Sequence, residues 1–365
     1  MTSHRVVFPQ YSRDTGLNSD TTKVMAKDSP NRREFLKAAG AAPSLFARNI
    51  FASKTGGANE KVNVAFIGVG RMGSRNMAYA ARVPGFRIAS VCDVCRPALE
   101  RAQAQSRRLG FDGVKARKDF REILADPSVD AVCIATPNQR RPYITVEACK
   151  AGKDVYVETP AFVHIEEGPK MVEAARKYGR VVQAGAVQRS GAALQKAREI
   201  VKNGDLGEIA FCSGFFHPGW GHALHPIDTV QFAFDEAMPV SVTAQATPDM
   251  MLVTYRYPGF ICSYESRGAS PRTPHCGTSF HGDQATLMVS CEEVSGMNVA
   301  HWKNFLECIQ TRARPVGDIE TCVRTTATCV LASLAIRHNV TLDWDDRAFA
   351  VKQNKMRLPM VGIAK

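Results

Sequence analysis

Short apolar runs alternate with amphipathic segments along the first half of the chain after residue 60. The apolar runs have the length and the β-branched content of buried strands and lie at 61–67, 86–92, 131–135, 154–157 and 181–184. Segments with helical periodicity lie between them, near 74–82, 96–108, 119–125, 141–151 and 166–178. This alternation predicts a parallel, doubly wound sheet covered by crossover helices, which is an α/β arrangement.

The pattern changes after residue 205. Strands rich in β-branched and aromatic residues are expected at 208–216, 240–247, 251–257, 260–266 and 285–290. Tyr257-Pro258-Gly259 predicts a turn between two of them, as in an antiparallel sheet. Helices are expected at 298–311 and near 318–338, and Thr341 to Lys365 is expected to be irregular. The second half therefore predicts an α+β domain with an open, mainly antiparallel sheet.

These patterns divide the chain into four parts. Residues 1–58 form a polar leader, 59–187 a nucleotide-binding domain, 188–350 an α+β domain for substrate and oligomer contacts, and 351–365 a tail.

A glycine-rich turn joins the first predicted strand to the first predicted helix. It has the form Gly-x-Gly-x-x-Gly and supplies candidate dinucleotide ligands at Gly68, Gly70, Arg71, Met72 and Gly73. The first glycine of such a turn permits the tight bend, the second lets the backbone approach a pyrophosphate, and the third lets the helix pack on the strand. The N-terminus of the helix that follows attracts phosphate.

An acidic residue at the end of the second predicted strand supports the same interpretation. Asp93 lies twenty residues after Gly73, where a Rossmann unit places the carboxylate that binds a ribose 2′-hydroxyl. A carboxylate there repels a 2′-phosphate, so NAD is predicted rather than NADP, although Arg96 weakens the preference. A Rossmann domain that binds NAD is expected.

Composition and charge limit the partners. The chain has 365 residues, 45% hydrophobic and 22% charged, as in an ordinary globular protein of two domains. The formal charge of +12 includes a surplus on the leader, and the remainder is scattered with no basic stripe interleaved with aromatics. A nucleic-acid partner is therefore not predicted, and no apolar run is judged long enough to span a bilayer.

The eleven cysteines favour buried free thiols. Most of them lie in predicted strands or helices, and the odd number does not suit a disulfide framework. Cys92 and Cys95 form a Cys-x-x-Cys pair, but no second pair follows at zinc spacing, so no metal is predicted.

The leader contains Asn31-Arg32-Arg33-Glu34-Phe35-Leu36-Lys37, which resembles a twin-arginine export signal except at Asn31. The apolar stretch that follows is interrupted by Pro43 and Arg48, and no clear cleavage site stands out. Export to the periplasm by this route is the expected localisation, with a cytoplasmic protein as the alternative if the signal is not functional. The route carries folded proteins, which suits an NAD-binding chain.

From residue 60 to about 350 the chain resembles the glucose–fructose oxidoreductase/inositol dehydrogenase/MocA family. The resemblance is carried by the glycine turn, Ala135-Thr136-Pro137-Asn138, the stretch from Gly152 to Pro160, Gln188-Arg189-Ser190, and the stretch from His301 to Leu306. It implies a small carbohydrate or polyol substrate, oxidised or reduced at a hydroxyl, and a homo-oligomer formed through the sheet domain. It also implies cofactor contacts beyond the glycine turn, from Thr136, Pro137, Asn138, Glu158, Thr159, Pro160 and Gln188.

Two positions depart from the family pattern. Thr159 stands where the family has a lysine that assists proton transfer, and threonine has no titratable proton near neutral pH. Gly221 stands where the family has an aspartate upstream of His225 and Asp228.

A cluster of histidines remains near these departures, at His217, His222 and His225, together with Trp220 and Asp228. His225 is the candidate general base, because imidazole titrates near neutral pH. Asp228, one helical turn on, is the candidate to orient its ring, and His222 is a candidate to replace a missing group. The alternatives are that these histidines cap or pack against the sheet, that Glu158 is only a surface acid or a helix-facing partner, and that Arg189 is a surface or interface ion-pair residue.

The sequence thus predicts an NAD(P)-dependent oxidoreductase that acts on a hydroxyl of a sugar, polyol or related carbohydrate, with atypical catalytic residues. Two alternatives remain open. One is an NAD-using glycosidase or redox isomerase without net oxidation, and the other is a non-catalytic NAD-binding sensor.

Overall fold

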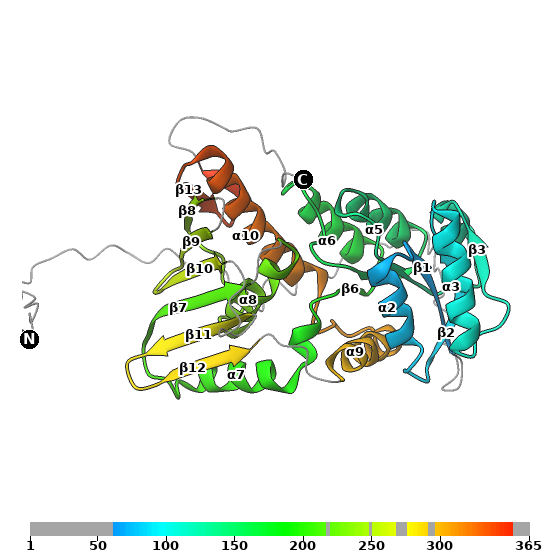
Figure 1. Ribbon diagram of the computed structural model, residues 1–365, viewed down its shortest axis with the longest axis horizontal. Helices are drawn as coiled ribbons and strands as arrows, with labels where there is room; N and C mark the ends of the chain where they lie inside the picture. Colours follow the sequence, from blue (N-terminus) through cyan, green and yellow to red (C-terminus); the bar gives the residue numbers. More distant parts are fainter. Residues whose placement is uncertain (1–60, 217–219, 248–249, 268–275, 291–295, 353–365) are drawn as a thin grey trace, which may run out of the picture. The chain divides into compact units, whose positions relative to one another are not determined.

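The computed structural model describes residues 61–216, 220–247, 250–267, 276–290 and 296–352 (Figure 1). The chain divides into two units, Met1–Phe51 and Ala52–Lys365, and every described residue belongs to the second. The predicted export signal lies outside the described residues, as does the tail beyond residue 352.

The first half of the described chain forms a parallel six-stranded sheet in the order β3-β2-β1-β4-β5-β6. The strands are β1 (Val62–Ile67), β2 (Phe86–Cys92), β3 (Lys115–Arg117), β4 (Ala131–Ile134), β5 (Asp154–Val157) and β6 (Val182–Ala184). The order reverses between β1 and β4, which is the switch point at which α/β sheets bind ligands. Its strands β1, β4, β5 and β6 are almost completely buried, because helices cover both faces of the sheet.

The helices of this half connect successive strands. They are α2 (Arg71–Ala80), α3 (Arg96–Arg108), α4 (Phe120–Ala125), the 3₁₀ turn η1 (Asn138–Arg140), α5 (Arg141–Lys150) and α6 (Glu167–Lys177). A second 3₁₀ turn, η2 (Val187–Ser190), follows β6 and leads to α7 (Ala192–Asn203). The predicted α/β Rossmann domain is confirmed.

The second half forms an eight-stranded sheet in the order β12-β11-β7-β10-β9-β8-β13-β14. The strands are β7 (Ile209–Phe216), β8 (Ser241–Ala246), β9 (Met250–Arg256), β10 (Ile261–Arg267), β11 (Cys276–Gly282), β12 (Thr286–Ser290), β13 (Leu342–Asp345) and β14 (Ala350–Lys352). β7 and β10 pair in parallel and the other assigned pairs of this sheet are antiparallel. The turn predicted at Tyr257-Pro258-Gly259 joins β9 to β10, with the Tyr257 amide donating to the Phe260 carbonyl. The expected α+β architecture is therefore also confirmed.

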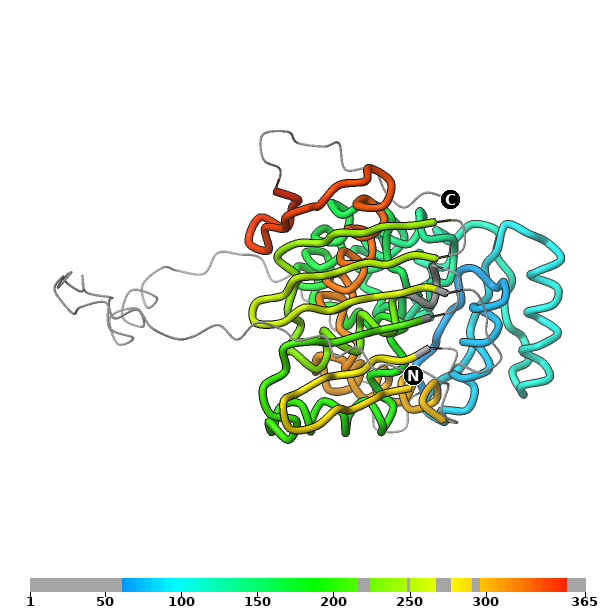
Figure 2. Tube along the Cα trace, turned by 60° about the vertical axis from the view of Figure 1, so that its left-hand side comes forward, coloured from blue at the N-terminus to red at the C-terminus, as the bar shows by residue number. Residues whose placement is uncertain are grey.

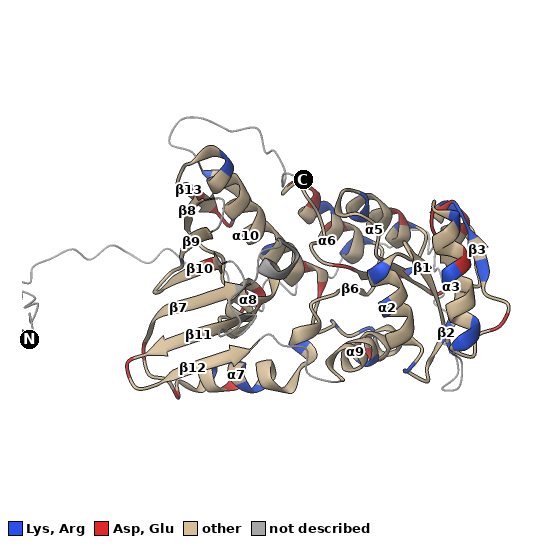
Figure 3. Cartoon of the chain, viewed as in Figure 1, with Lys and Arg blue, Asp and Glu red and all other residues tan. Residues whose placement is uncertain are grey.

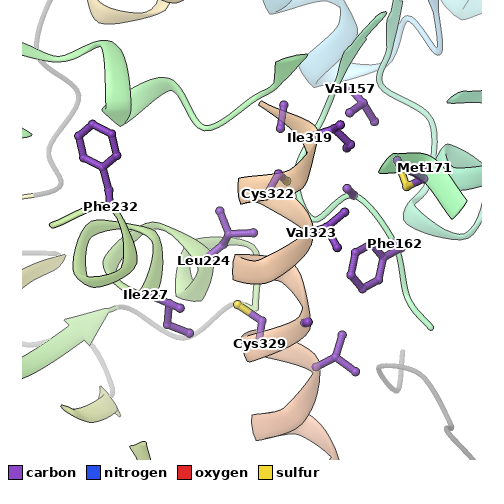
Figure 4. Close-up of a cluster of buried hydrophobic side chains, with 14 of the residues drawn as sticks. Val157, Phe162, Met171, Leu224, Ile227, Phe232, Ile319, Cys322, Val323 and Cys329 are labelled. Atoms are coloured by element: carbon purple, nitrogen blue, oxygen red, sulfur yellow. The ribbon is translucent and has the colours of Figure 1, made fainter. Parts of the chain in front are cut away.

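Helices α8 (Trp220–Ala233) and α10 (Ile319–His338) pack against one face of this sheet. Figure 2 shows that no helix of the described residues lies over the other face. α10 is the central core helix. Figure 4 shows its buried side chains between α8 on one side and residues of β5 and α6 on the other, so α10 joins the two halves.

Helix α9 (Met297–Thr311) follows the second sheet in the chain but packs against the first half. Trp302 and Phe305 are completely buried with Phe66 and Phe86 of β1 and β2, and the Trp302 ring stacks on Tyr156 at 4.4 Å between centroids. The domain boundary predicted at residue 187 does not account for α9, because this helix follows the boundary in sequence but packs against the first half.

Three expectations from the sequence need correction. Thr341 to Lys365 is not irregular throughout, because β13 and β14 extend the second sheet. The short edge strand β3, the strand β11 of the second sheet and the helices α7 and α8 were not predicted as elements. Among the described residues, α10 is long and apolar enough by length and composition to cross a membrane, but 78% of its most apolar stretch is buried within the protein. Its apolarity serves the core.

Nine cysteines whose side chains are described are free, and eight of these nine are buried, which confirms the prediction of buried thiols. Burial raises the pKa of the Cys92 thiol to about 12, with Asp93 adding to the effect. Cys95 is exposed.

Candidate functional site

The glycine turn between β1 and α2 has three glycines with three different environments. Gly68 has φ +84°, and a Cβ there would lie 2.8 Å from backbone atoms of Ala135 and Thr136. A Cβ on Gly73 would lie 1.9 Å from the Gly68 carbonyl oxygen, so the helix packs directly on the turn. A Cβ on Gly70 would meet no atom within 4 Å. Gly68 and Gly73 are therefore required by the fold, whereas Gly70 faces open space.

Asp93 lies beside this turn, as the spacing predicted. One carboxylate oxygen accepts the Val69 amide at 2.9 Å, and the other accepts the Cys95 amide at 2.9 Å. These bonds fix the carboxylate at the edge of the glycine turn. Each oxygen keeps a further lone pair that can accept from a ribose hydroxyl.

Three observations on this structure fit a bound dinucleotide. Gly70 leaves room for a group to approach the backbone. Helix α2 has no capping side chain and no acidic residue in its first turn, so its N-terminal amides and dipole are available to a phosphate. The Thr136 hydroxyl is buried without a hydrogen-bond partner within the described part of the chain. A buried hydroxyl normally has a partner, which points to a ligand atom there.

The turns after β4 and β5 lie next to each other and are joined by one side chain. Arg141, at the start of α5, donates from Nε to the Thr136 carbonyl at 2.8 Å and from Nη1 to the Pro160 carbonyl at 2.6 Å. Its side chain is buried, and this burial lowers the pKa of Arg141 while the nearby Glu158 raises it. Thr136, Asn138, Thr159 and Pro160 are half-buried and Pro137 is exposed around this junction.

Glu158 is not a surface acid, because its side chain is buried. It is 6% exposed and accepts the Asn76 side-chain amide of α2 at 2.6 Å. Asn76 in turn accepts the Trp302 indole N–H of α9 at 3.4 Å, and Glu158 also accepts the Thr159 backbone amide at 3.2 Å. Of the alternatives for Glu158, the helix-facing partner is the one observed, and the possibility of a surface acid was wrong.

The turn η2 brings Gln188 and Arg189 into the interior. Gln188 is buried, at 8% exposed, and Arg189 is 1% exposed. Arg189 is an ion-pair residue, as one alternative held, but its position at the surface is wrong because the side chain is buried. His301 of α9 holds η2 from the other side, since its Nδ1 accepts the Ser190 hydroxyl at 2.8 Å and its Nε2 donates to the Ala184 carbonyl at 2.7 Å. Burial lowers the pKa of His301 to about 4, so the ring is neutral.

Helix α8 carries the candidate catalytic residues. His225 is half-buried and Asp228, one turn on, is buried at 2%. The Asp228 carboxylate accepts from Arg189 Nη2 at 2.6 Å, from Arg189 Nε at 2.9 Å and from the Thr325 hydroxyl at 2.9 Å. The Asp228 carboxylate therefore binds Arg189 and Thr325. The expectation that Asp228 orients the His225 ring stays a prediction.

The other members of the histidine cluster lie outside the described side chains. His217 precedes α8 and is not described, and His222 lies within α8 with a side chain that is not described. Within the described side chains, no group of three or more His, Cys, Asp or Glu residues is placed to hold a metal ion.

Sequence reasoning missed the roles of Arg141, Asn76 and Arg189. Each is a polar or charged residue in a segment that the pattern makes largely buried, and a buried polar residue needs a partner. That requirement was the available signal. It does not select the partner, because the partners of Asn76 and Arg189 lie 82 and 39 residues away, and Arg141 binds backbone carbonyls, which every residue carries.

Residues 62–186 match the profile of an oxidoreductase family with an NAD-binding Rossmann fold. The chain is 31% identical over 158 residues to a scyllo-inositol 2-dehydrogenase (NAD(+)) of Bacillus subtilis, which covers 42% of this chain and 44% of that protein. It is 30% identical over 168 residues to a levoglucosan dehydrogenase of Pseudarthrobacter phenanthrenivorans, 44% of this chain and 42% of that protein. The chain thus matches less than half the length of these relatives.

Solved structures share the whole architecture. A myo-inositol 2-dehydrogenase from Lactobacillus plantarum matches with a TM-score of 0.70 and 16% identity, over 78% of this chain and 100% of that one. A scyllo-inositol dehydrogenase from Lactobacillus casei, with bound NAD(H) and scyllo-inositol, matches with a TM-score of 0.66 and 17% identity, over 78% and 99%. At this identity the likeness establishes the fold.

Proposed function

Because residues 62–186 match the profile of an oxidoreductase family with an NAD-binding Rossmann fold, we propose that this chain is an NAD-dependent oxidoreductase acting on a hydroxyl of a sugar, polyol or related carbohydrate. The observation that carries the proposal is an arrangement of three features that would suit a dinucleotide. The open position at Gly70, the uncapped α2 and the fixed carboxylate of Asp93 lie together at the switch point of the parallel sheet.

The residues that would hold NAD follow from this arrangement. The backbone of Gly68 to Gly73 would bind the pyrophosphate and Asp93 the adenosine ribose, which disfavours the additional phosphate of NADP. The turns that contain Thr136 and Thr159 would hold the nicotinamide half. Pro137, Asn138 and Pro160 belong to the same turns.

Bound NAD would supply a hydride acceptor for oxidation of an alcohol carbon. The part left to the chain is to orient the substrate and to accept the hydroxyl proton. His225 is proposed as that acceptor, since a neutral imidazole takes up a proton near pH 7 and Thr159 cannot. The named relatives act on inositols and levoglucosan, which supports a cyclic polyol or sugar as the substrate class.

The proposal is tested in a single turnover. The purified protein is loaded with NAD and mixed with a panel of sugars, cyclic polyols and anhydrosugars, while nicotinamide absorbance is followed. Reduction by one class of substrate is expected. His225→Asn is expected to lower the rate by roughly a hundredfold or more, the usual size of a general-base contribution. His338→Asn, at the exposed end of α10, is the matched control and should keep the wild-type rate.

The same experiment addresses the alternative functions. A flat absorbance trace with NAD demonstrably bound would contradict the dehydrogenase and favour a non-catalytic sensor. Recovery of turnover by Thr159→Lys with Gly221→Asp would then trace the inactivity to those two positions. Cleavage or isomerisation of a sugar without net reduction would favour the redox isomerase or glycosidase.

A homo-oligomer is proposed on the uncovered face of the second sheet. Phe211, Ile261, Leu252, Met250 and Met288 are between 38% and 58% exposed. The strand register puts them on one face, opposite to α8 and α10. Figure 3 shows charged residues gathered on α3, α5 and α6 and few on these strands. Exposed apolar groups in one patch are typical of an interface.

Export by the twin-arginine route is proposed from the motif that contains Arg32 and Arg33. Residues 1–58 fused to a reporter enzyme should carry it to the periplasm, and the double variant Arg32→Lys with Arg33→Lys should leave it in the cytoplasm. Equal periplasmic reporter activity in both fusions would contradict the proposal.

A further inference from the structure

One buried guanidinium uses all of its nitrogen atoms in ion pairs. Arg189 binds Asp228 through Nε and Nη2, and it binds Glu236 through Nη1 at 2.6 Å and Nη2 at 2.9 Å. The Phe232 ring lies on the guanidinium, with 4.9 Å between the Cζ atom and the ring centroid. Burial alone would lower the pKa of Arg189, but the two carboxylates raise it, so the side chain is a permanent cation.

The backbone of Arg189 is held as firmly as its side chain. Its amide donates to the Ala186 carbonyl at 3.1 Å, and its carbonyl accepts from the Gln195 side chain at 2.6 Å. The next residue, Ser190, is bound to the buried His301. Because η2 starts three residues after β6, this guanidinium is anchored to the carboxyl end of the parallel sheet.

The carboxylate that Arg189 binds belongs to the helix that presents His225. Asp228 follows His225 by three residues on α8, so both lie on neighbouring positions of one helical face. The His225 carbonyl also accepts the Thr229 hydroxyl at 3.0 Å, within the same turn. A shift of Asp228 would therefore carry His225 with it.

Stability is a poor explanation for such a pair. Burying two charges costs about as much free energy as their attraction returns, and apolar residues of similar volume often replace a buried ion pair without loss of stability. A guanidinium that donates to two carboxylates does fix the positions of the segments that carry them, because its planar set of N–H donors allows few arrangements.

We propose that Arg189 is a positioning residue, which fixes helix α8, and hence His225, against the strand ends where the cofactor is proposed to bind. The inference rests on the proposed function of His225. In this proposal the Arg189–Asp228 pair sets the distance between the proton acceptor and the reacting hydroxyl. The pair itself contacts neither substrate nor cofactor.

The test removes both charges at once. In Arg189→Met with Asp228→Leu the buried volume is kept and neither charge of the pair is left alone. The carboxylate of Glu236 loses its partner, but its side chain is 22% exposed and can be hydrated, so the double variant is expected to fold. Arg189→Lys is the conservative companion. Arg176→Lys is the matched control. Arg176 also binds an aspartate through two guanidinium nitrogens, Asp318 at the start of α10, but its side chain is 33% exposed and neither residue lies on α8.

The full-length protein is measured in three ways: unfolding temperature, NAD affinity, and kcat and KM with the best substrate of the panel. The double variant is expected to keep the unfolding temperature and NAD affinity, to lose at least tenfold in kcat, and to show little change in KM. Arg189→Lys should lose less, and the Arg176→Lys control should keep wild-type kcat. A folded double variant with wild-type kcat would overturn the proposal.

A fourth reading separates this inference from the proposed function. The ring signals of His225 are followed by nuclear magnetic resonance in the NAD-bound protein and are assigned by their loss in His225→Asn. A shifted His225 signal in the double variant, but not in Arg176→Lys, supports positioning even if no substrate of the panel turns over. An unshifted signal overturns it whatever the activity.

Discussion

The three glycines of the β1–α2 turn make separable contributions to fold and cofactor binding. Gly73→Ala places a methyl group 1.9 Å from the Gly68 carbonyl oxygen, so we expect a loss of roughly 3 kcal/mol in the free energy of unfolding or no folding at all. Gly70→Ala meets no atom within 4 Å, so we expect an unchanged unfolding temperature but at least tenfold weaker NAD binding. Thermal unfolding and calorimetric titration with NAD measure both. Equal NAD affinity in Gly70→Ala and wild type would contradict the proposed position of the pyrophosphate.

His301 makes the stability of this protein depend on pH. Burial lowers its pKa from 6.5 to about 4, and Arg189 adds to this effect, whereas Asp228 and the bond to Ala184 oppose it. Between these values the unfolded chain binds a proton that the folded protein does not, so stability falls as pH is lowered from 6.5 to 4. The contribution is about 3 kcal/mol when fully lost.

Urea unfolding between pH 4 and 7 measures this dependence. His301→Gln should be less stable at pH 7 but should have a flatter profile, because the titrating group is gone. His338→Gln, at an exposed position, should keep the wild-type slope. Identical slopes in His301→Gln and wild type would refute the assignment.

At the scale of elements, the site is assembled by side chains that join neighbouring turns. Arg141 of α5 holds the turns after β4 and β5 through the carbonyls of Thr136 and Pro160. Asn76 of α2 joins α9 to β5 through Trp302 and Glu158. The turns that are proposed to hold the nicotinamide half are therefore fixed by helices rather than by their own sequence.

Arg141→Met tests this arrangement. It leaves two carbonyls without their donor, so we expect a loss of about 2–4 kcal/mol in the free energy of unfolding. We also expect NAD affinity to fall by more than the loss of folded protein explains. The neighbouring Arg140 is exposed, and Arg140→Met should stay within about 0.5 kcal/mol of the wild type. Chemical unfolding and NAD titration of both variants make the comparison, and equal effects would contradict the role of Arg141.

For the whole molecule, the uncovered face of the second sheet predicts self-association. Ile261 and Met288 are 45% and 58% exposed on that face, on β10 and β12. Ile261→Lys with Met288→Lys introduces charges that an apolar interface cannot pair, so we expect the mass from light scattering to fall to that of a monomer. Tyr143→Lys, at a 50% exposed residue on α5, should leave the mass unchanged. A monomeric wild type, or the same oligomer in all three proteins, would contradict the proposed interface.

The sequence by itself determined the fold class and the place of Asp93 beside the glycine turn. Strands β1, β2, β4, β5 and β6 are short apolar runs, and the glycine turn with Asp93 depends on residues within about thirty positions of one another. Local spacing decides such features, because backbone sterics and strand length act over a few residues.

Only the tertiary structure decided which partners the buried polar and charged side chains have. Arg189 meets Asp228 and Glu236 across 39 and 47 residues, and Trp302 meets Asn76 across 226. β3, β13 and β14 are short strands whose formation depends on the edge of a sheet already in place. A sequence shows that a buried polar residue needs a partner, but burial and hydrogen-bond geometry in three dimensions select which one it is.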